Sequence, residues 1–321
     1  MIRILGIVGP TGGGKSALAL ALAERLGGEI ISCDSMQVYR RMDIGTAKPT
    51  PQEQRRIQHH LIDIADPCEQ FSCADYVPLA EEAIASCAAA GKLPIVCGGT
   101  GLYLDALLRK NDFLPNTVDE ELRRELWAIA ETDGTERLYR ELESVDPESA
   151  AATHPNNVKR VIRALEIYRT CGLTKTELDR RSREGGMRYD ACVIGLRYAD
   201  RSLLYRRIDD RVDAMMAAGL ERETRELMAQ GVFERNLTAA QAIGYKELLP
   251  YCRGEISLSE AVEQLKMATR RYAKRQMTWF GAKDYVRWID LAQNPTEKTF
   301  EEIVNNAERL FQNREKCDII K

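Results

Sequence analysis

The chain has 321 residues, of which 44% are hydrophobic and 30% charged, and its formal net charge at pH 7 is -3. This composition is typical of soluble globular proteins, and the length allows either one large core with an insertion or two domains. No segment looks like a signal peptide or a membrane span, so we expect a cytoplasmic protein without membrane contact.

Nine cysteines show no CxxC pair, and the chain has only three histidines. Metal and disulfide frameworks are usually visible as regular cysteine or histidine spacing. The spacing therefore argues against a zinc site and against a disulfide framework.

The first 110 residues alternate short apolar runs with helical stretches. Helices are expected at 16–26 and 72–90. This alternation is typical of βαβ units and predicts a parallel sheet. The expected strands are IRILGIV (2–8), GEIISCD (28–34), LIDI (61–64) and KLPIVCGG (92–99).

From Pro115 the pattern changes to amphipathic helical segments, which continue to about residue 192. A strand at 191–198 returns to the sheet, and helices then dominate until a late strand at 285–290. We therefore predict an α/β core formed by residues 1–114 and 193–321, with an all-helical insertion at 115–192.

The segment GPTGGGKS matches G-x-x-x-x-G-K-[ST] between a predicted strand and a predicted helix. In such a loop, backbone N–H groups and the helix N-terminus bind phosphate oxygens, the lysine adds charge and the hydroxyl reaches Mg²⁺. A glycine-rich turn without a ligand is the less favoured alternative. The motif predicts a P-loop NTPase-like core and a phosphate site with Ser16 as the metal ligand, formed by Gly9, Pro10, Thr11, Gly12, Gly13, Gly14, Lys15 and Ser16.

Nucleotide-binding loops of this kind usually work with an acid at the end of a nearby apolar strand. The strand before Thr100 ends in two glycines instead, and the acid, Asp34, follows the second strand. That position is at the carboxyl edge of the sheet, where doubly wound folds bind ligands. Asp34 could hold magnesium through water, act as a general base, or only cap the next turn.

Charge is unevenly distributed along the chain. Residues 119–148 carry 4 Lys or Arg against 11 Asp or Glu, residues 159–188 carry 9 against 4, and residues 266–287 carry 7 against 1. Such basic stretches favour a polyanionic partner, although solvated helix faces are the more ordinary explanation for any one of them. Lys266, Arg270 and Lys274 would form a stripe along one helix, flanked by Arg271 and Arg275.

Eight motifs, in order along about 280 residues, resemble the bacterial tRNA dimethylallyltransferases. They are GPTGGGKS, DSMQVYRRMDIGTAKP, HHLIDI, FSCADY, GGTGLY, HPNNVKRVIRALEIYRTCG, QAIGYKEL and RRYAKRQMTWF. The family's loop is more often GPTASGKT or GPTGSGKT, and the zinc finger of eukaryotic relatives is absent.

The resemblance implies transfer of a dimethylallyl group from dimethylallyl diphosphate to the N6 amine of the adenosine immediately 3′ of the tRNA anticodon, with release of diphosphate. The loop would then hold that diphosphate with Mg²⁺. Asp34 would be the general base, Thr100 would orient the amine or the adenine, and Arg211 would be catalytic, with Arg207 as the alternative. The residues expected to contact the anticodon stem-loop are Asp34, Ser35, Met36, Gln37, Thr100, Arg123, Lys159, Arg160, Val161, Ile162, Arg163, Lys266, Arg270, Arg271, Lys274 and Arg275.

Two other classes remain open from the residues alone. A P-loop small-molecule kinase would share the loop and the sheet, and a non-catalytic RNA-binding protein would use the basic helices only. The sequence leaves open whether ATP binds the loop. We expect a monomer because no long exposed heptad pattern is visible.

Overall fold

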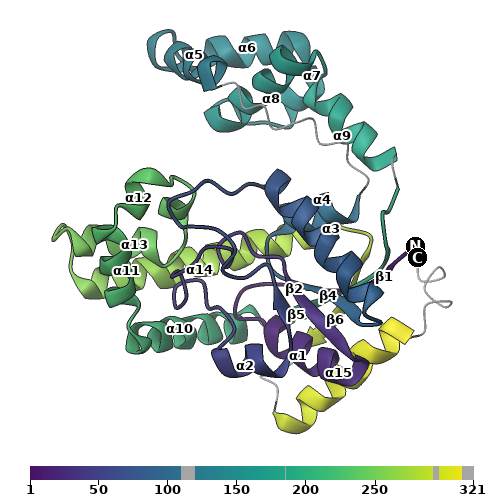
Figure 1. The fold of residues 1–321 in the computed structure, drawn as a ribbon. Coiled ribbons are helices and arrows are strands. Elements are labelled where there is room, and N and C mark those ends of the chain that lie inside the picture. Colours follow the sequence, from purple (N-terminus) through teal and green to yellow (C-terminus); the bar gives the residue numbers. More distant parts are fainter. Residues whose placement is uncertain (110–119, 185, 292–295, 313–321) are drawn as a thin grey trace. The chain divides into compact units, whose positions relative to one another are not determined.

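The computed structural model describes residues 1–109, 120–184, 186–291 and 296–312 (Figure 1). The chain divides into two compact units, one formed by residues 1–108 with 189–321 and the other by residues 109–188. The second unit is inserted between two strands of the first. Its limits lie a few residues before those expected at 115 and 192.

A six-stranded parallel sheet, in the order β3-β2-β4-β1-β5-β6, forms the centre of the first unit, which confirms the predicted fold class. Its middle strands are apolar and buried because helices cover both faces of a parallel sheet. The late strand expected at 285–290 is confirmed. The strands are β1 (Arg3–Val8), β2 (Gly28–Ser32), β3 (His59–His60), β4 (Leu93–Cys97), β5 (Asp190–Tyr198) and β6 (Val286–Leu291).

The prediction of a strand at 61–64 is wrong. Strand β3 contains only His59 and His60, and Leu61 and Asp63 have positive φ angles of 63° and 58°. A strand cannot continue through left-handed backbone. The buried Lys48 ammonium bonds to Asp63 and Asp43, so a tertiary ion pair holds this segment in a turn despite its β-branched residues.

The helices of the first unit lie on both sides of the sheet and beyond one end of it (Figure 1). Helices α1 and α15 lie side by side against the sheet, where the Arg25 guanidinium bonds to the Asn305 amide oxygen at 2.6 Å. The helices are α1 (Lys15–Leu26), α2 (Pro51–Arg56), α3 (Cys73–Ala89), α4 (Gly101–Leu108), α10 (Arg201–Ala218), α11 (Leu220–Ala229), α12 (Val232–Arg235), the 3₁₀ turn η1 (Ala239–Gln241), α13 (Tyr245–Cys252), α14 (Leu258–Gly281) and α15 (Glu297–Gln312).

Helices α10 to α14 pack around the loop that follows β2. Tyr245, fully buried, lies directly against Gly45, where a Cβ atom would be 2.5 Å from the tyrosine ring. The Tyr245 hydroxyl donates to Glu223 at 2.6 Å, and that carboxylate also accepts the backbone N–H groups of residues 43–45. These contacts fix the loop that borders the site described below.

The second unit is helical in its described part, apart from a single bridge between Arg109 and Met187. Leu138, Leu142 and Leu165 are fully buried in its core, as expected for amphipathic helices with apolar residues one turn apart. Its helices are α5 (Glu120–Thr132), α6 (Thr135–Val145), α7 (Pro147–Ala151), α8 (Val158–Cys171) and α9 (Lys175–Glu184). Across the described part of the chain, no helix combines the length and the hydrophobicity that a membrane crossing requires.

Candidate active site

The predicted phosphate loop connects β1 to α1 and curls back on itself. Gly9 has a φ of 135°, and a Cβ there would lie 2.6 Å from the Leu196 carbonyl oxygen. The Gly13 N–H and the Lys15 ammonium both donate to the Pro10 carbonyl, at 3.0 and 2.8 Å. Only glycine fits at position 9, and the lysine is folded over the loop, where it can meet a bound anion.

Three predicted segments follow three neighbouring strands. The loop follows β1, Asp34 follows β2, and Thr100 follows β4, which lies between the other two. Asp34 Oδ1 accepts the Met36 N–H at 2.9 Å, and Thr100 Oγ1 accepts the Ser35 N–H at 3.0 Å. Asp34 therefore caps the turn that follows β2. Capping the turn does not prevent it from acting as a general base as well, so these two predictions for Asp34 are compatible.

Packing explains why no acid follows β4. A Cβ at Gly98 would lie 2.0 Å from the Cys33 carbonyl oxygen, and one at Gly99 would lie 2.1 Å from Gln276 Nε2. A side chain at either position would collide with its neighbour, so neither glycine can be replaced by an acid, and the carboxylate of this site is that of Asp34, which follows β2.

Helix α14 contributes two site residues that the sequence analysis missed. Gln276, 5% exposed, accepts the Thr11 N–H at 2.8 Å and donates to the Gly99 carbonyl at 3.0 Å. It thus ties the phosphate loop to the end of β4. Tyr272, one turn earlier, lines the same pocket, and burial raises its pKa. The available signal was a glutamine on the buried stripe of an amphipathic helix, between Ala273 and Phe280.

Helix α10 brings two arginines to the loop. Arg207 Nε donates to the Gly12 carbonyl at 2.9 Å, and Arg211 lines a pocket with Lys15 and Asp34. Burial lowers the pKa of Arg211, and it lowers the pKa of Lys15 to about 8, with Arg211 adding to the effect and Asp34 opposing it. Two half-buried cations share the nearby Asp34 carboxylate, which is an arrangement that a bound polyanion would stabilise.

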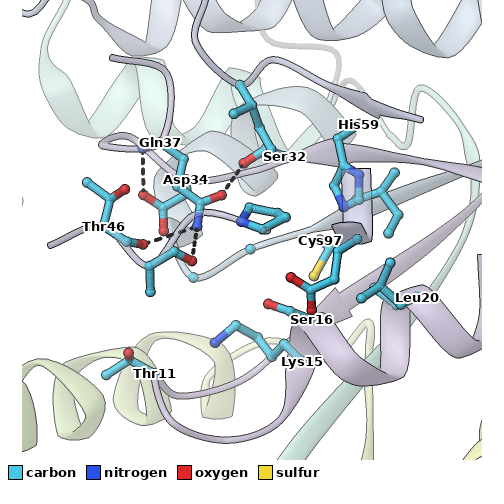
Figure 2. Close-up of a pocket in the computed structure, with 18 of the residues that line it drawn as sticks. Thr11, Lys15, Ser16, Leu20, Ser32, Asp34, Gln37, Thr46, His59 and Cys97 are labelled. Atoms are coloured by element: carbon cyan, nitrogen blue, oxygen red, sulfur yellow. Dashed lines mark hydrogen bonds between the residues drawn. The ribbon is translucent and has the colours of Figure 1, made fainter. Parts of the chain in front are cut away.

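The pocket between the loop and Asp34 holds about 760 Å³ of empty space, part of it open to solvent. Figure 2 shows Asp34 on one side of this space and Lys15 and Ser16 on the other. Its other walls include the apolar side chains of Leu20, Ile30 and Ile62. The pocket therefore combines a cationic loop with an apolar region.

A second pocket, with about 950 Å³ of empty space, adjoins the first. The two have Asp34, Arg211 and Tyr272 in common, and the second also has Ser35 and Met36 in its wall. Gln37 lines only the first, where its amide donates to the Thr46 carbonyl at 3.2 Å. Asp34 thus lies where the two pockets meet.

The predicted basic stripe on α14 is partly used within the protein. Lys266, whose side chain is 15% exposed, bonds to Asp213 of α10 at 2.7 Å, and Arg270 lies 3.6 Å from Asp209. Arg271, Lys274 and Arg275 are exposed, and Arg275 lines the second pocket. The last three therefore remain the stronger candidates for RNA contact.

Predicted RNA contacts in the helical unit divide in the same way. Lys159 and Arg160 are exposed, whereas Arg123 and Arg163 both bond to the buried Glu166, at 2.5 and 3.3 Å. The Val161 and Ile162 side chains are 1% and 2% exposed and belong to the apolar core of the unit. RNA contact at these two positions stays a prediction, and it would have to come from the backbone because the side chains lie on the buried stripe of α8.

Known proteins resemble the chain over nearly its whole length. The family described as IPP transferase matches residues 37–283, and the one described as Isopentenyl transferase matches residues 2–66. A tRNA dimethylallyltransferase of Geobacillus thermodenitrificans is 51% identical over 289 residues, which is 90% of each chain. One of Caldanaerobacter subterraneus is 46% identical over 309 residues, covering 95% of this chain and 96% of the other.

Solved structures agree with the sequence matches. The full-length tRNA isopentenylpyrophosphate transferase of Bacillus halodurans superimposes with a TM-score of 0.72 at 43% identity, covering 99% of both chains. A eukaryotic dimethylallyltransferase acting on tRNA gives 0.79 at 30% identity, covering 98% of this chain and 80% of the other. The resemblance seen in the motifs is confirmed, and the chain belongs to the IPP transferase family, whose bacterial members include the tRNA dimethylallyltransferases.

Proposed function

We propose that this chain transfers the dimethylallyl group of dimethylallyl diphosphate to the N6 amine of the adenosine immediately 3′ of the anticodon in tRNA and releases diphosphate. The family assignment favours prenyl transfer to tRNA over the kinase and over simple RNA binding. The observation that carries the residue roles is the position of Asp34, where two pockets meet, facing the cationic loop.

The loop, Lys15 and Arg211 would bind the diphosphate. As the allylic C–O bond breaks, the carbon becomes partly cationic and negative charge grows on the departing oxygens. The half-buried cations and preorganised N–H groups would stabilise that charge in the transition state more than in the ground state. Arg207 holds the loop through the Gly12 carbonyl, so Arg211 is the better candidate for direct contact.

A magnesium ion fits the donors of this pocket. The Ser16 hydroxyl lines the pocket, and with diphosphate oxygens and water it would give the all-oxygen ligands that Mg²⁺ prefers. Asp34, across the pocket, would reach the ion only through water. When bound, the ion would neutralise charge on the leaving diphosphate.

The apolar walls of the first pocket would take the five-carbon chain, and the second pocket would take the adenine. Asp34 would accept the N6 proton as the new C–N bond forms. Thr100, held against the Ser35 N–H, would orient the amine. Since the target base must leave its stack to reach Asp34, the tRNA would present it extruded.

The exposed residues Arg271, Lys274 and Arg275 of α14, and Lys159 and Arg160 of the helical unit, would contact phosphates of the anticodon stem-loop. We propose a cytoplasmic location, because the proposed substrate is tRNA. We propose a monomer, which a molar mass measured by light scattering would test.

The test is to incubate the chain with unmodified tRNA and either dimethylallyl diphosphate or ATP, and to determine the masses of the ribonuclease fragments of the tRNA. We expect one dimethylallyl group on the adenosine next to the anticodon in the first arm only. Phosphate transfer from ATP to a small molecule, with unmodified tRNA in both arms, would instead support the kinase.

A further inference from the structure

Glu29, His60 and Cys87 converge in a part of the first unit that the proposed reaction does not use. They come from β2, β3 and α3. Glu29 Oε2 lies 2.7 Å from His60 Nε2, and Cys87 Sγ lies 3.4 Å from that oxygen and 3.5 Å from that nitrogen. One carboxylate oxygen, one imidazole nitrogen and one sulfur atom therefore surround a single point.

The spacing of these atoms is close to that of a tetrahedral zinc site. With Zn–N and Zn–O distances of about 2.0–2.1 Å and a Zn–S distance of about 2.3 Å, a tetrahedron requires sulfur to lie about 3.5 Å from each of the other two ligand atoms. Both separations are already present. The oxygen and nitrogen would have to move apart by about 0.6 Å, as two metal bonds replace their hydrogen bond.

A nucleophilic relay does not explain the cluster. In such a relay, the acid and the nucleophile bond to opposite nitrogens of the imidazole. Here Glu29 and Cys87 both face Nε2 of His60. Three different ligand atoms that surround one point are arranged as in a metal site and not as in a proton relay.

The cluster is also accessible to a cation. The side chains of Glu29 and His60 are each 23% exposed, while Cys87 is buried behind them. Three protein ligands with one side open to solvent leave a fourth position for water.

We propose that Glu29, His60 and Cys87 bind a divalent cation of the zinc class, separate from the magnesium at the diphosphate. Sulfur and imidazole favour zinc over magnesium. The three ligands lie far apart in the sequence, so the cysteine and histidine spacing that argued against a zinc site could not reveal them. The ion would join β2, β3 and α3, beside His59, which lines the first pocket.

The experiment uses the metal alone as the probe. The full-length chain, without an affinity tag and stripped of metal, is titrated with Co²⁺ in the absence of diphosphate. We expect one equivalent to bind per chain, with the strong visible bands of tetrahedral Co²⁺ and a thiolate-to-cobalt charge-transfer band. Zn²⁺ should displace the cobalt and a large excess of Mg²⁺ should not.

Variants assign the site. Cys87→Ala should lose the charge-transfer band, and Cys171→Ala, which removes a half-buried thiol in the helical unit, should keep it. Glu29→Gln preserves the side-chain volume and should weaken Co²⁺ binding by more than about tenfold. Zn²⁺ should raise the melting temperature of the wild type and of Cys171→Ala. A wild type without a thiolate band, a band that survives in Cys87→Ala, or unchanged affinity in Glu29→Gln would overturn the proposal.

Discussion

Raising the pH above about 8 should weaken the binding of dimethylallyl diphosphate, because the Lys15 charge is lost there. Burial lowers the pKa of Lys15 from 10.5 to about 8 in the free protein. Below pH 8 the ammonium is already charged when the ligand arrives. Above pH 8 the ligand must bring a proton with it, so its affinity falls as the pH rises.

The size of the effect follows from that pKa. If only the charged form binds, the apparent dissociation constant is inversely proportional to the fraction of charged Lys15 and should rise about 30-fold between pH 7 and pH 9.5. At pH 8.5 each binding event should take up about 0.8 proton. The diphosphate raises the lysine pKa in the complex, so the bound state stays charged over this range.

Isothermal titration calorimetry measures both the dissociation constant and the proton uptake. It is done without tRNA, so that the dimethylallyl group has no acceptor and no reaction takes place. Repeating the titration in two buffers of different ionisation enthalpy gives the proton uptake. Lys15→Met is the matched control, with similar length and no charge, and should bind weakly and without pH dependence. Constant wild-type affinity up to pH 9.5, or an equal slope in Lys15→Met, would refute the reasoning.

Three further variants test other parts of the site. Asp34→Asn keeps the shape of the side chain and removes the base, so the single-turnover rate should fall by about 10²–10⁴-fold while tRNA binding is retained; a rate near that of the wild type would reject the assignment. Gln276→Leu leaves two backbone groups without their hydrogen-bond partner, which costs about 1–3 kcal/mol each, so urea unfolding should show a clear loss of stability. An unchanged midpoint would contradict the role of Gln276 in tying the phosphate loop to the end of β4. Changing Lys274 and Arg275 together to Gln should reduce the slope of log affinity for tRNA against log salt by about 0.7–0.9 per contact. Arg222→Gln, on the exposed side of α11, is the control. An equal slope in both variants would exclude this part of α14 from the RNA surface.

Local sequence patterns predicted the parts of the site that lie on one continuous segment. The phosphate loop needs a strand, glycines, a lysine and a helix in sequence, and all of them lie within residues 3–26. The strand at 285–290 is short and rich in β-branched and aromatic residues, and it could be found in the same way. The position of Asp34 beside the loop could be predicted because strand ends in a parallel sheet share one edge.

Long-range packing decided what the sequence did not reveal. The Gln276 side chain joins residues 11 and 99, and nothing near position 276 in the sequence indicates either partner. Val161 and Ile162 were included with their basic neighbours, although α8 turns them into the core of the helical unit. The LIDI segment has the residue pattern of a strand, but ion pairs with Lys48 hold it in a turn.

The position of the acid on β2 rather than β4 suits a displacement at carbon. Neighbouring strands lie about 4.8 Å apart, so the ends of β1 and β2, with β4 between them, are separated by about 9–10 Å. The incoming amine approaches the carbon to about 3–3.5 Å, and its base must be within about 2.6–3.2 Å of the amine. An acid at the end of β4 would be one strand from the loop, beside the diphosphate, where it would repel the leaving group and leave no room for the amine. Asp34, two strands away, can hold the nucleophile on the side of the carbon opposite the departing oxygen.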